Sequence, residues 1–375
     1  MDVILGIAIG VVHVLGILSA ISAVMTSRTS QGAIAWTISL ATFPLMLVAV
    51  PAYWIFGRSR FRGYVSARQN RDAHARTVLE DILACSALRE SAQDEHHGAI
   101  RAIERLARMP FLGSNATELL IDGERTFESI LSGIAGATNY VLVQFYIIED
   151  DELGGRLKEA LIERAHAGVR VCLLYDEIGS HKLHRAYRKA LSRAGVEVRE
   201  FHSSRGRGNR FQLNFRNHRK IVVADGHVGW VGGHNVGDEY LGKNPKFGAW
   251  RDTHIKLAGP AVLGLQLSFL EDWHWATDEV LELSWTPALA PDSDQEVLIV
   301  PSGPADDMET ASLMFQQTIH SARERLWIAS PYFVPDEGVV AALQLAALRG
   351  VDVRVLIPNK PDHLLVYLSA FAFLG

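Results

Sequence analysis

Three residues with side chains suited to phosphate chemistry occur at fixed spacing in the middle of this chain: His218, Lys220 and Asp225. Alternate side chains of an extended strand point to the same face, so His218 and Lys220 should lie side by side. An imidazole can attack phosphorus, and a neighbouring ammonium can neutralise the charge of a phosphodiester. The spacing therefore predicts a nucleophilic site for phosphoryl transfer.

The residues that follow predict a tight hairpin. Two apolar runs flank the dipeptide Asp225-Gly226, which is typical of a two-residue turn. That turn would place Ala224 opposite His227, and Gly233 opposite the motif histidine, where its small size leaves room for a ligand. Asn235 would then share a face with the motif histidine and lysine, and its amide could donate to a phosphate oxygen.

The two motifs together, His-x-Lys-x4-Asp and then Gly-Gly-x-Asn, resemble the signature of the phospholipase D superfamily. The sequence is similar to bacterial cardiolipin synthases over essentially the whole chain, including the apolar N-terminus, Trp250-Arg251-Asp252 and Ser330-Pro331-Tyr332-Phe333. The resemblance implies two α/β/α halves that face each other across a cleft, each with one His-Lys-Asp set. It also implies that two phosphatidylglycerol molecules react to give cardiolipin and glycerol, without a cofactor.

In the reaction that this resemblance implies, His218 attacks the phosphodiester of one lipid and forms a phosphohistidine. Lys220 and Asn235 hold the phosphoryl oxygens. A second histidine, from the opposing half, protonates the leaving glycerol and then deprotonates the hydroxyl of the incoming lipid. One phosphodiester is exchanged for another, so no ATP is needed.

Further residues are candidates for supporting roles. Arg216 is a candidate for the phosphate site. The family resemblance also implies a carboxylate that orients the nucleophile, for which Asp252 is the first candidate and Glu239 the second. The role of Asp225 stays open, because aspartate favours turns and this one could hold the hairpin instead of touching substrate.

Two other functions fit the same residues. One is a membrane-anchored phospholipase D-type hydrolase of phospholipids or nucleic acid, and the other is a non-catalytic protein that binds lipid. The net charge of −5 argues against nucleic acid as a partner. The intact set of His218, Lys220 and Asp225 argues against a non-catalytic role.

A metal site is not expected. His227 and His234 lie near His218 in the sequence, but no carboxylate or thiolate is spaced with them in a recurring ligand pattern. Cys85 and Cys172 are far apart and form no Cys-x-x-Cys pair, which argues against a disulfide scaffold and a zinc-thiolate site.

The N-terminus is strongly apolar. Residues 3–25 and 32–57 contain no formally charged side chain, and each is long enough to cross a hydrocarbon layer of about 30 Å. The sequence therefore predicts a transmembrane helical hairpin in the bacterial inner membrane. Six arginines between positions 58 and 76 follow the second span, whereas the connecting loop has only Arg28, so the remaining chain should lie in the cytoplasm.

The soluble part repeats one order of elements. We predict a strand over 140–148, a helix over 152–166 and a strand over 169–175, and the same order over 326–334, 337–348 and 351–357. This pattern indicates a duplicated α/β/α sandwich with a mostly parallel sheet. The predicted boundaries are a transmembrane hairpin (1–57), a juxtamembrane linker (58–115), a first phospholipase D-like half (116–290) and an incomplete second half (291–375).

The spacing of the repeat predicts a second catalytic histidine near position 400, beyond the last residue, Gly375. We therefore expect an incomplete sequence whose product alone is inactive. The alternative is a homo-oligomer in which two first halves pair across a dimer.

Overall fold

The computed structural model describes residues 2–26, 30–54, 97–201, 216–291, 293, 295–303, 306–358 and 368–373. They fall into two compact units, one made of the N-terminal helices and the other of the elements from α6 onward. The predicted arginine cluster at 58–76 and Cys85 lie outside the described residues, as does most of the predicted linker.

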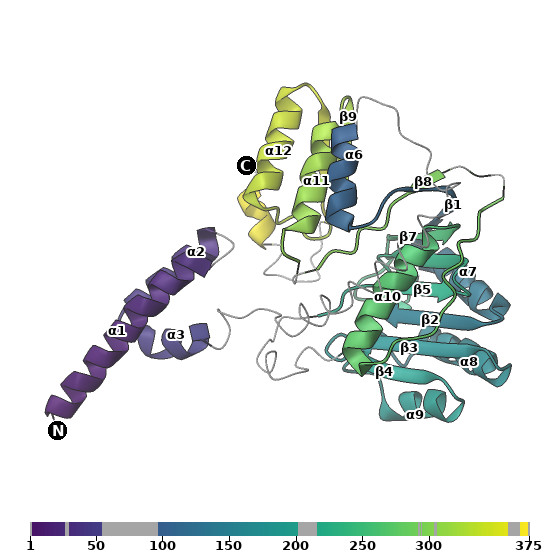
Figure 1. Ribbon diagram of the computed structural model, residues 1–375, viewed down its shortest axis with the longest axis horizontal. Coiled ribbons are helices and arrows are strands. Elements are labelled where there is room, and N and C mark those ends of the chain that lie inside the picture. Colours follow the sequence, from purple (N-terminus) through teal and green to yellow (C-terminus); the bar gives the residue numbers. More distant parts are fainter. Residues whose placement is uncertain are drawn as a thin grey trace. The chain divides into compact units, whose positions relative to one another are not determined.

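The N-terminal unit consists of α1 (Asp2–Thr26), α2 (Ser30–Ala41) and α3 (Met46–Ala52) (Figure 1). They pack through a small core that includes Ala23, Leu40 and Tyr53. In the described part of the chain, no helix is both long and apolar enough to cross a membrane. The predicted transmembrane hairpin is therefore not supported.

The second predicted transmembrane helix is interrupted in the structure, for a physical reason. It is not one helix but two, α2 with 12 residues and α3 with seven. Pro44 lies between them, and proline cannot continue the hydrogen bonding of a helix. At about 1.5 Å per residue, neither helix reaches the roughly 30 Å of a bilayer core.

The larger unit is built on an eight-stranded sheet in the order β4-β3-β2-β5-β6-β7-β1-β8. Its strands are β1 (Leu112–Ile121), β2 (Tyr140–Phe145), β3 (Arg170–Asp176), β4 (Glu197–Phe201), β5 (Ile221–Ala224), β6 (Val228–Gly232), β7 (Thr253–Ala258) and β8 (Gln295–Val297). Only β2, β3 and β4 pair in parallel, while the other pairs are antiparallel. The expectation of a mostly parallel sheet was wrong, because the chain after β4 returns through hairpins, and hairpins produce antiparallel pairs.

Helices cover the two faces of this sheet (Figure 1). The main core joins α7 (Asp122–Gly136), α8 (Glu152–His166) and α9 (Arg185–Arg193) to one face, where Val143 is buried. The next side chain of β2, Gln144, points the other way and bonds to Asp272 on α10 (Val262–Thr277). Since neighbouring strand residues face opposite sides, α10 lies on the opposite face.

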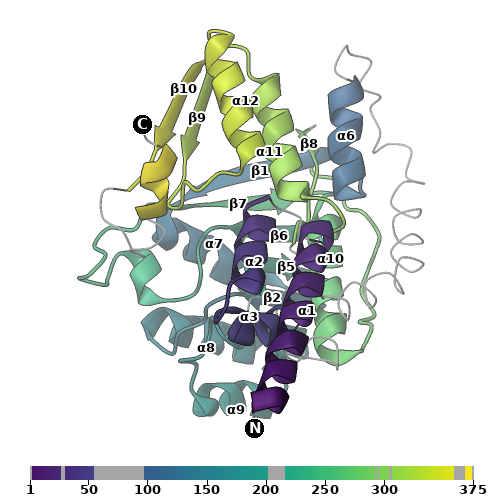
Figure 2. The ribbon, with the colours of Figure 1, turned by 90° about the vertical axis from the view of Figure 1, so that its left-hand side faces the viewer.

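The predicted repeat is present in the described residues. α8 begins at the N-cap Asp151 and is followed by Gly168 at φ +84°, and its bounds are those predicted. In the second copy, β9 (Arg325–Ala329) and β10 (Asp352–Leu356) form a parallel pair connected by α12 (Glu337–Leu348), beside α11 (Thr310–Ser321) (Figure 2). Gly350 has φ +87°, a left-handed conformation that glycine adopts readily at a helix end.

Three further elements are short: α6 (His97–Ala107) before the sheet, the 3-10 helix η3 (Asp238–Leu241) after β6, and the 3-10 helix η4 (Phe371–Phe373) at the end of the described residues. α6 lies within the predicted linker, and β1 also begins there. The sheet therefore starts earlier in the sequence than the predicted first half.

Candidate active site

The motif segment lies where two neighbouring strands meet. In the antiparallel pair of β2 and β5, Gln144 is opposite Ile221, so the residues before β5 lie beside the end of β2. This places His218 and Lys220 next to Tyr146, the residue that follows β2. The predicted closeness of the histidine and the lysine is confirmed, because the ammonium of Lys220 donates to the carbonyl of His218 at 2.7 Å.

Tyr146 is the centre of this group. Its ring stacks on the imidazole of His218, with centroids 3.8 Å apart and planes inclined by 22°. The Lys220 Nζ lies 5.6 Å from the centroid of the same ring, and an Arg216 guanidinium nitrogen is 3.4 Å from its hydroxyl. Tyr146 lies outside both sequence motifs, but it lies against three of the predicted site residues.

The charges around His218 favour its neutral form. His218 is exposed to solvent, but its ring is partly buried. This burial is the main cause that lowers the pKa of the imidazole to about 4, and the positive charges of Lys220 and Arg216 lower it further. Burial also lowers the pKa of Lys220 to about 8, although the negative charge of Asp252 opposes this shift. At neutral pH the site thus combines an unprotonated imidazole with a charged ammonium, as nucleophilic attack on a phosphodiester requires.

Asp225 lies away from this group, at the other end of β5. Its carboxylate accepts hydrogen bonds from the backbone N–H groups of Thr138, Asn139 and Tyr140, each at 2.8 Å. Burial tends to raise the pKa of Asp225, but these bonds outweigh burial and lower it. The carboxylate therefore fastens the hairpin turn to the start of β2, the structural alternative considered from the sequence.

The hairpin has a different register from the predicted one. Ala224 pairs with Val228, so the loop contains His227 as well as Asp225 and Gly226. Both Asp225 and Gly226 have positive φ, and the N–H of His227 donates to the Ala224 carbonyl at 3.1 Å. The carbonyl of His227 accepts from Gly259. This contact with a distant residue shifts the predicted pairing by one residue.

Asn235 is buried and bonded within the fold. Its side-chain oxygen accepts from the N–H of Ile147 at 3.2 Å, and its amide donates to the hydroxyl of Tyr240 at 2.9 Å. These bonds join the end of β2 to η3. One amide hydrogen remains for another acceptor.

Gly233 and Asp252 are close neighbours. A Cβ atom on Gly233 would lie 2.1 Å from the Asp252 carboxylate, so only glycine allows this approach. The carboxylate accepts from the backbone N–H of Thr253 at 2.7 Å and acts electrostatically on Lys220. Within the described chain, no hydrogen bond joins Asp252 to His218, so the structure brings Asp252 to the lysine and not to the nucleophile.

Glu239 also lies elsewhere than predicted. It belongs to η3, where burial raises the pKa of its carboxyl group despite a hydrogen bond from Tyr240. Its charged neighbours are Glu149, Asp151 and Lys182. In the part of the chain that the structure describes, Glu239 makes no hydrogen bond to His218.

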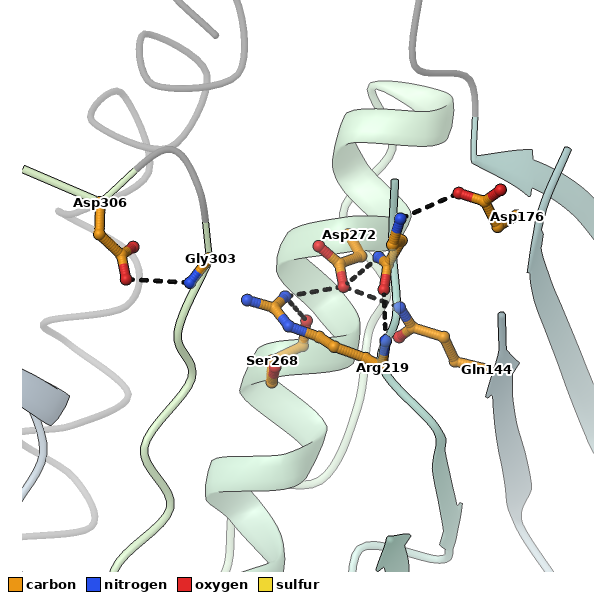
Figure 3. A network of polar contacts seen from close by, with 8 residues as sticks. Gln144, Asp176, Arg219, Ser268, Asp272, Gly303 and Asp306 are labelled. Carbon is orange, nitrogen blue, oxygen red and sulfur yellow. Dashed lines mark hydrogen bonds and ion pairs between the residues drawn. The ribbon is translucent and has the colours of Figure 1, made fainter. Parts of the chain in front are cut away.

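Sequence reasoning missed a buried network behind the motif (Figure 3). One oxygen of Asp272 accepts from Gln144 at 2.8 Å and from Asn217 and Arg219 at 2.7 Å each. Asn217 and Arg219 alternate with His218 and Lys220, so they point to the opposite side, toward α10. The adjacent acidic residues Glu271 and Asp272 inside the mostly apolar sequence of α10 were the available signal.

Asp176, the last residue of β3, fixes the same segment from another direction. One of its oxygens accepts from the N–H of Asn217 at 2.9 Å, and the other accepts from Ile178 and Gly179 at 2.9 Å each. The residue is 1% exposed, and burial raises the pKa of its carboxyl group despite these bonds. A polar residue at the carboxyl end of a parallel strand was the signal that could have identified it.

Two buried histidines lie close to the lysine. The rings of His234 and His254 are 5.6 Å apart, and among the described residues neither ring has a hydrogen-bond partner. Burial is the main cause that lowers both pKa values, for His254 to about 3. No group of three or more His, Cys, Asp or Glu side chains in the described ranges is arranged to hold a metal ion.

Comparison with known proteins places this site in a family. The family model described as "Cardiolipin synthase, PLD-like domain" matches residues 130–249 and 315–374. Cardiolipin synthase A from Pseudomonas entomophila (strain L48) is 50% identical over 98% of this chain and 77% of its own length, and that from Pseudomonas putida (strain GB-1) gives the same values. Among solved structures, phosphatidylserine synthase from Haemophilus influenzae Rd KW20 is 15% identical, with a TM-score of 0.48, over 73% of this chain and 72% of that one.

The identity to these synthases extends across almost the whole sequence and includes the segment that carries His218 and Lys220. The chain therefore belongs to the cardiolipin synthase family of the phospholipase D superfamily.

Proposed function

We propose that this chain forms cardiolipin by transferring a phosphatidyl group between two phosphatidylglycerol molecules, with His218 as the nucleophile. The observation that carries the assignment of His218 is its place beside Lys220 and Tyr146, in surroundings that lower the pKa of the imidazole. The names of relatives that are about 50% identical over 98% of the chain support the reaction. They favour transfer over the two alternatives, hydrolysis and non-catalytic lipid binding.

The reaction proceeds in two displacements. An imidazole nitrogen of His218 attacks the phosphorus of one phosphatidylglycerol, the bond from phosphorus to the glycerol oxygen breaks, and a general acid protonates the leaving glycerol. The hydroxyl of a second phosphatidylglycerol then attacks the phosphohistidine, loses its proton to the same group and releases His218. The family resemblance assigns that group to a histidine of a second motif. In the alternative of a homo-oligomer that pairs two first halves, His218 of the second copy takes this role.

The cations hold the phosphate during both steps. Lys220 and Arg216 both lie near Tyr146 and can neutralise the phosphoryl oxygens. Asn235 has one amide hydrogen left for an oxygen, so its role in substrate binding stays a prediction. We propose that Asp252 keeps Lys220 charged by raising its pKa. Among the described residues, no contact to His218 supports an orienting role for Asp252 or Glu239.

We also propose that the N-terminal unit attaches the protein to the bacterial inner membrane. Exposed apolar side chains line α1, among them Val11, Val14, Ile17, Leu18, Ile21 and Val24. Burial of such a surface in lipid would be favourable by about 25 cal/mol per Å². Two membrane crossings, a cytoplasmic catalytic unit and a homo-oligomer stay predictions, as do the boundaries 1–57, 58–115, 116–290 and 291–375.

The catalytic assignment is tested by expression in bacteria that lack their own cardiolipin synthases. We expect the His218→Ala variant to form no cardiolipin above the background seen by mass spectrometry, because the covalent step loses its nucleophile. His227→Ala is the matched control, since His227 lies exposed in the hairpin loop at the far end of β5. Cardiolipin from the His218 variant at the level of the control would refute the assignment.

A further inference from the structure

We propose that Tyr146 is a positioning residue, and that it holds the imidazole of His218 for attack by stacking on that ring while Gly179 packs against the tyrosine. This inference rests on the proposed role of His218 as the nucleophile. It concerns a side chain outside both sequence motifs, on the loop that follows β2. The argument uses the stacking geometry, the space at Gly179 and the hydrogen bonds of Asp176.

The stacked tyrosine limits how the imidazole can turn. Rotation of a histidine ring about its Cβ–Cγ bond sweeps the ring edges out of plane. With the ring of Tyr146 parallel to within 22° at a centroid distance of 3.8 Å, such a rotation would drive an edge into the phenol. Within the described residues, the ring nitrogens of His218 make no hydrogen bond that could hold the ring instead, so stacking supplies the constraint.

Tyr146 also packs closely against the loop after β3. A Cβ atom on Gly179 would lie 2.7 Å from Cε2 of the tyrosine ring and 2.2 Å from the tyrosine carbonyl. Both distances are far below van der Waals contact, so a glycine is required there for steric reasons. The hydroxyl of Ser180 donates to the same carbonyl at 3.1 Å and keeps the loop in place.

One buried carboxylate, that of Asp176, connects the loop at Gly179 with the segment that carries His218. Asp176 accepts the N–H of Gly179, which packs against Tyr146, and the N–H of Asn217, which precedes His218. Three strands therefore contribute to the placement of the nucleophile: β3 through Asp176, β2 through Tyr146 and β5 through His218. A nucleophile held in this way starts from a restricted geometry, and misplacement by about 1 Å can cost about 10²-fold in rate.

The experiment compares four variants of the full chain in detergent–phosphatidylglycerol micelles. Tyr146→Leu removes the stacked ring, and Tyr146→Phe keeps the ring but removes the hydroxyl. Gly179→Ala adds a Cβ atom that clashes with Tyr146 and displaces it, and Gly155→Ala is its control, because a Cβ atom on that helical glycine meets no other atom. Each variant is assayed for kcat and KM, and the imidazole of His218 is followed by NMR with 13C-labelled histidine.

We expect Tyr146→Leu to lower kcat about 10²-fold with a much smaller change in KM. Gly179→Ala should lower kcat in the same way, while Tyr146→Phe and Gly155→Ala should stay within about threefold of the parent. In the NMR spectrum, the Cε1–H proton of His218 should be shifted upfield by the tyrosine ring. It should lose that shift in Tyr146→Leu and keep it in Tyr146→Phe.

Two kinetic results would overturn the inference: a parental kcat in Tyr146→Leu, or a loss of the same size in Tyr146→Phe and Tyr146→Leu. An unshifted His218 proton in the parent protein would also do so, and this readout requires no turnover. The proposed function fails separately, through cardiolipin formation by His218→Ala. The two failures are therefore distinguishable.

Discussion

The carboxylate of Asp225 accepts the backbone N–H of Tyr140 at 2.8 Å, and this bond separates the third motif residue from the other two. The four residues of β5 lie between Asp225 and the segment of His218 and Lys220. At about 3.3 Å per strand residue, the distance exceeds any direct contact with a substrate phosphate on His218. The motif thus combines two functions, chemistry at one end of the strand and attachment of the hairpin at the other.

The first prediction separates these functions. Asp225→Ala should lower the free energy of unfolding by about 2–3 kcal/mol, because three backbone N–H groups lose their acceptor. The kcat of the folded fraction should stay within about threefold of the parent. Chemical denaturation and initial rates measure the two quantities, with Asp225→Asn as a milder variant that keeps one acceptor oxygen. A kcat reduced by about 10²-fold at unchanged stability would instead assign Asp225 a part in the reaction.

The second prediction concerns the pH dependence of kcat/KM. Lys220, with a pKa of about 8, loses its charge above that pH, so phosphate binding should weaken on the alkaline side. Lys220→Arg should extend activity to higher pH, since a guanidinium stays protonated. Asp252→Asn should move the alkaline limb to lower pH, because Asp252 raises the pKa of Lys220. Identical alkaline limbs in all three proteins would contradict the proposed role of Asp252.

The third prediction concerns the network behind the motif. Asp272→Ala should cost about 3–5 kcal/mol of stability, because it leaves Arg219 partly buried without its carboxylate. Exposed Glu279, just beyond the end of α10, provides the control Glu279→Ala, which should stay within about 0.5 kcal/mol. Removal of Arg219 as well should recover part of the loss. Strictly additive losses in the double variant would mean that the two side chains do not stabilise each other.

The fourth prediction follows from the burial of His254. The unfolded imidazole binds a proton near pH 6.5, whereas the folded one does so only near pH 3. Between these values the unfolded state binds more protons, so the free energy of unfolding should fall as the pH drops, by up to ~1.4 kcal/mol per pH unit. His234 and Lys220 face His254 and strengthen this shift, and His218 adds a slope of the same sign.

Denaturation at pH 7 and pH 5 tests this prediction. His254→Gln should lose less stability between the two pH values than the parent protein, because the glutamine does not titrate. The exposed His227→Gln should behave like the parent. Equal pH dependence in the parent and the His254 variant would show that folding does not lower the pKa of His254.

The sequence alone was sufficient for the local elements and for the family. The helices Glu152–His166 and Glu337–Leu348 have the bounds that apolar periodicity and the following glycines predicted. The closeness of His218 and Lys220 followed from the period of a strand, and the comparisons confirmed the family resemblance. These features depend on residues close together in the chain, so the sequence pattern is enough to predict them.

Only the tertiary structure decided which distant residues meet. The hairpin register, the antiparallel part of the sheet and the placement of Asp252 beside Lys220 depend on pairing across many residues. The second predicted span is divided at Pro44 into α2 and α3, although its apolar composition alone predicted one continuous helix. Tyr146, Asp176 and Asp272 have no motif of their own, because each acquires its role from neighbours that the folded sheet brings together.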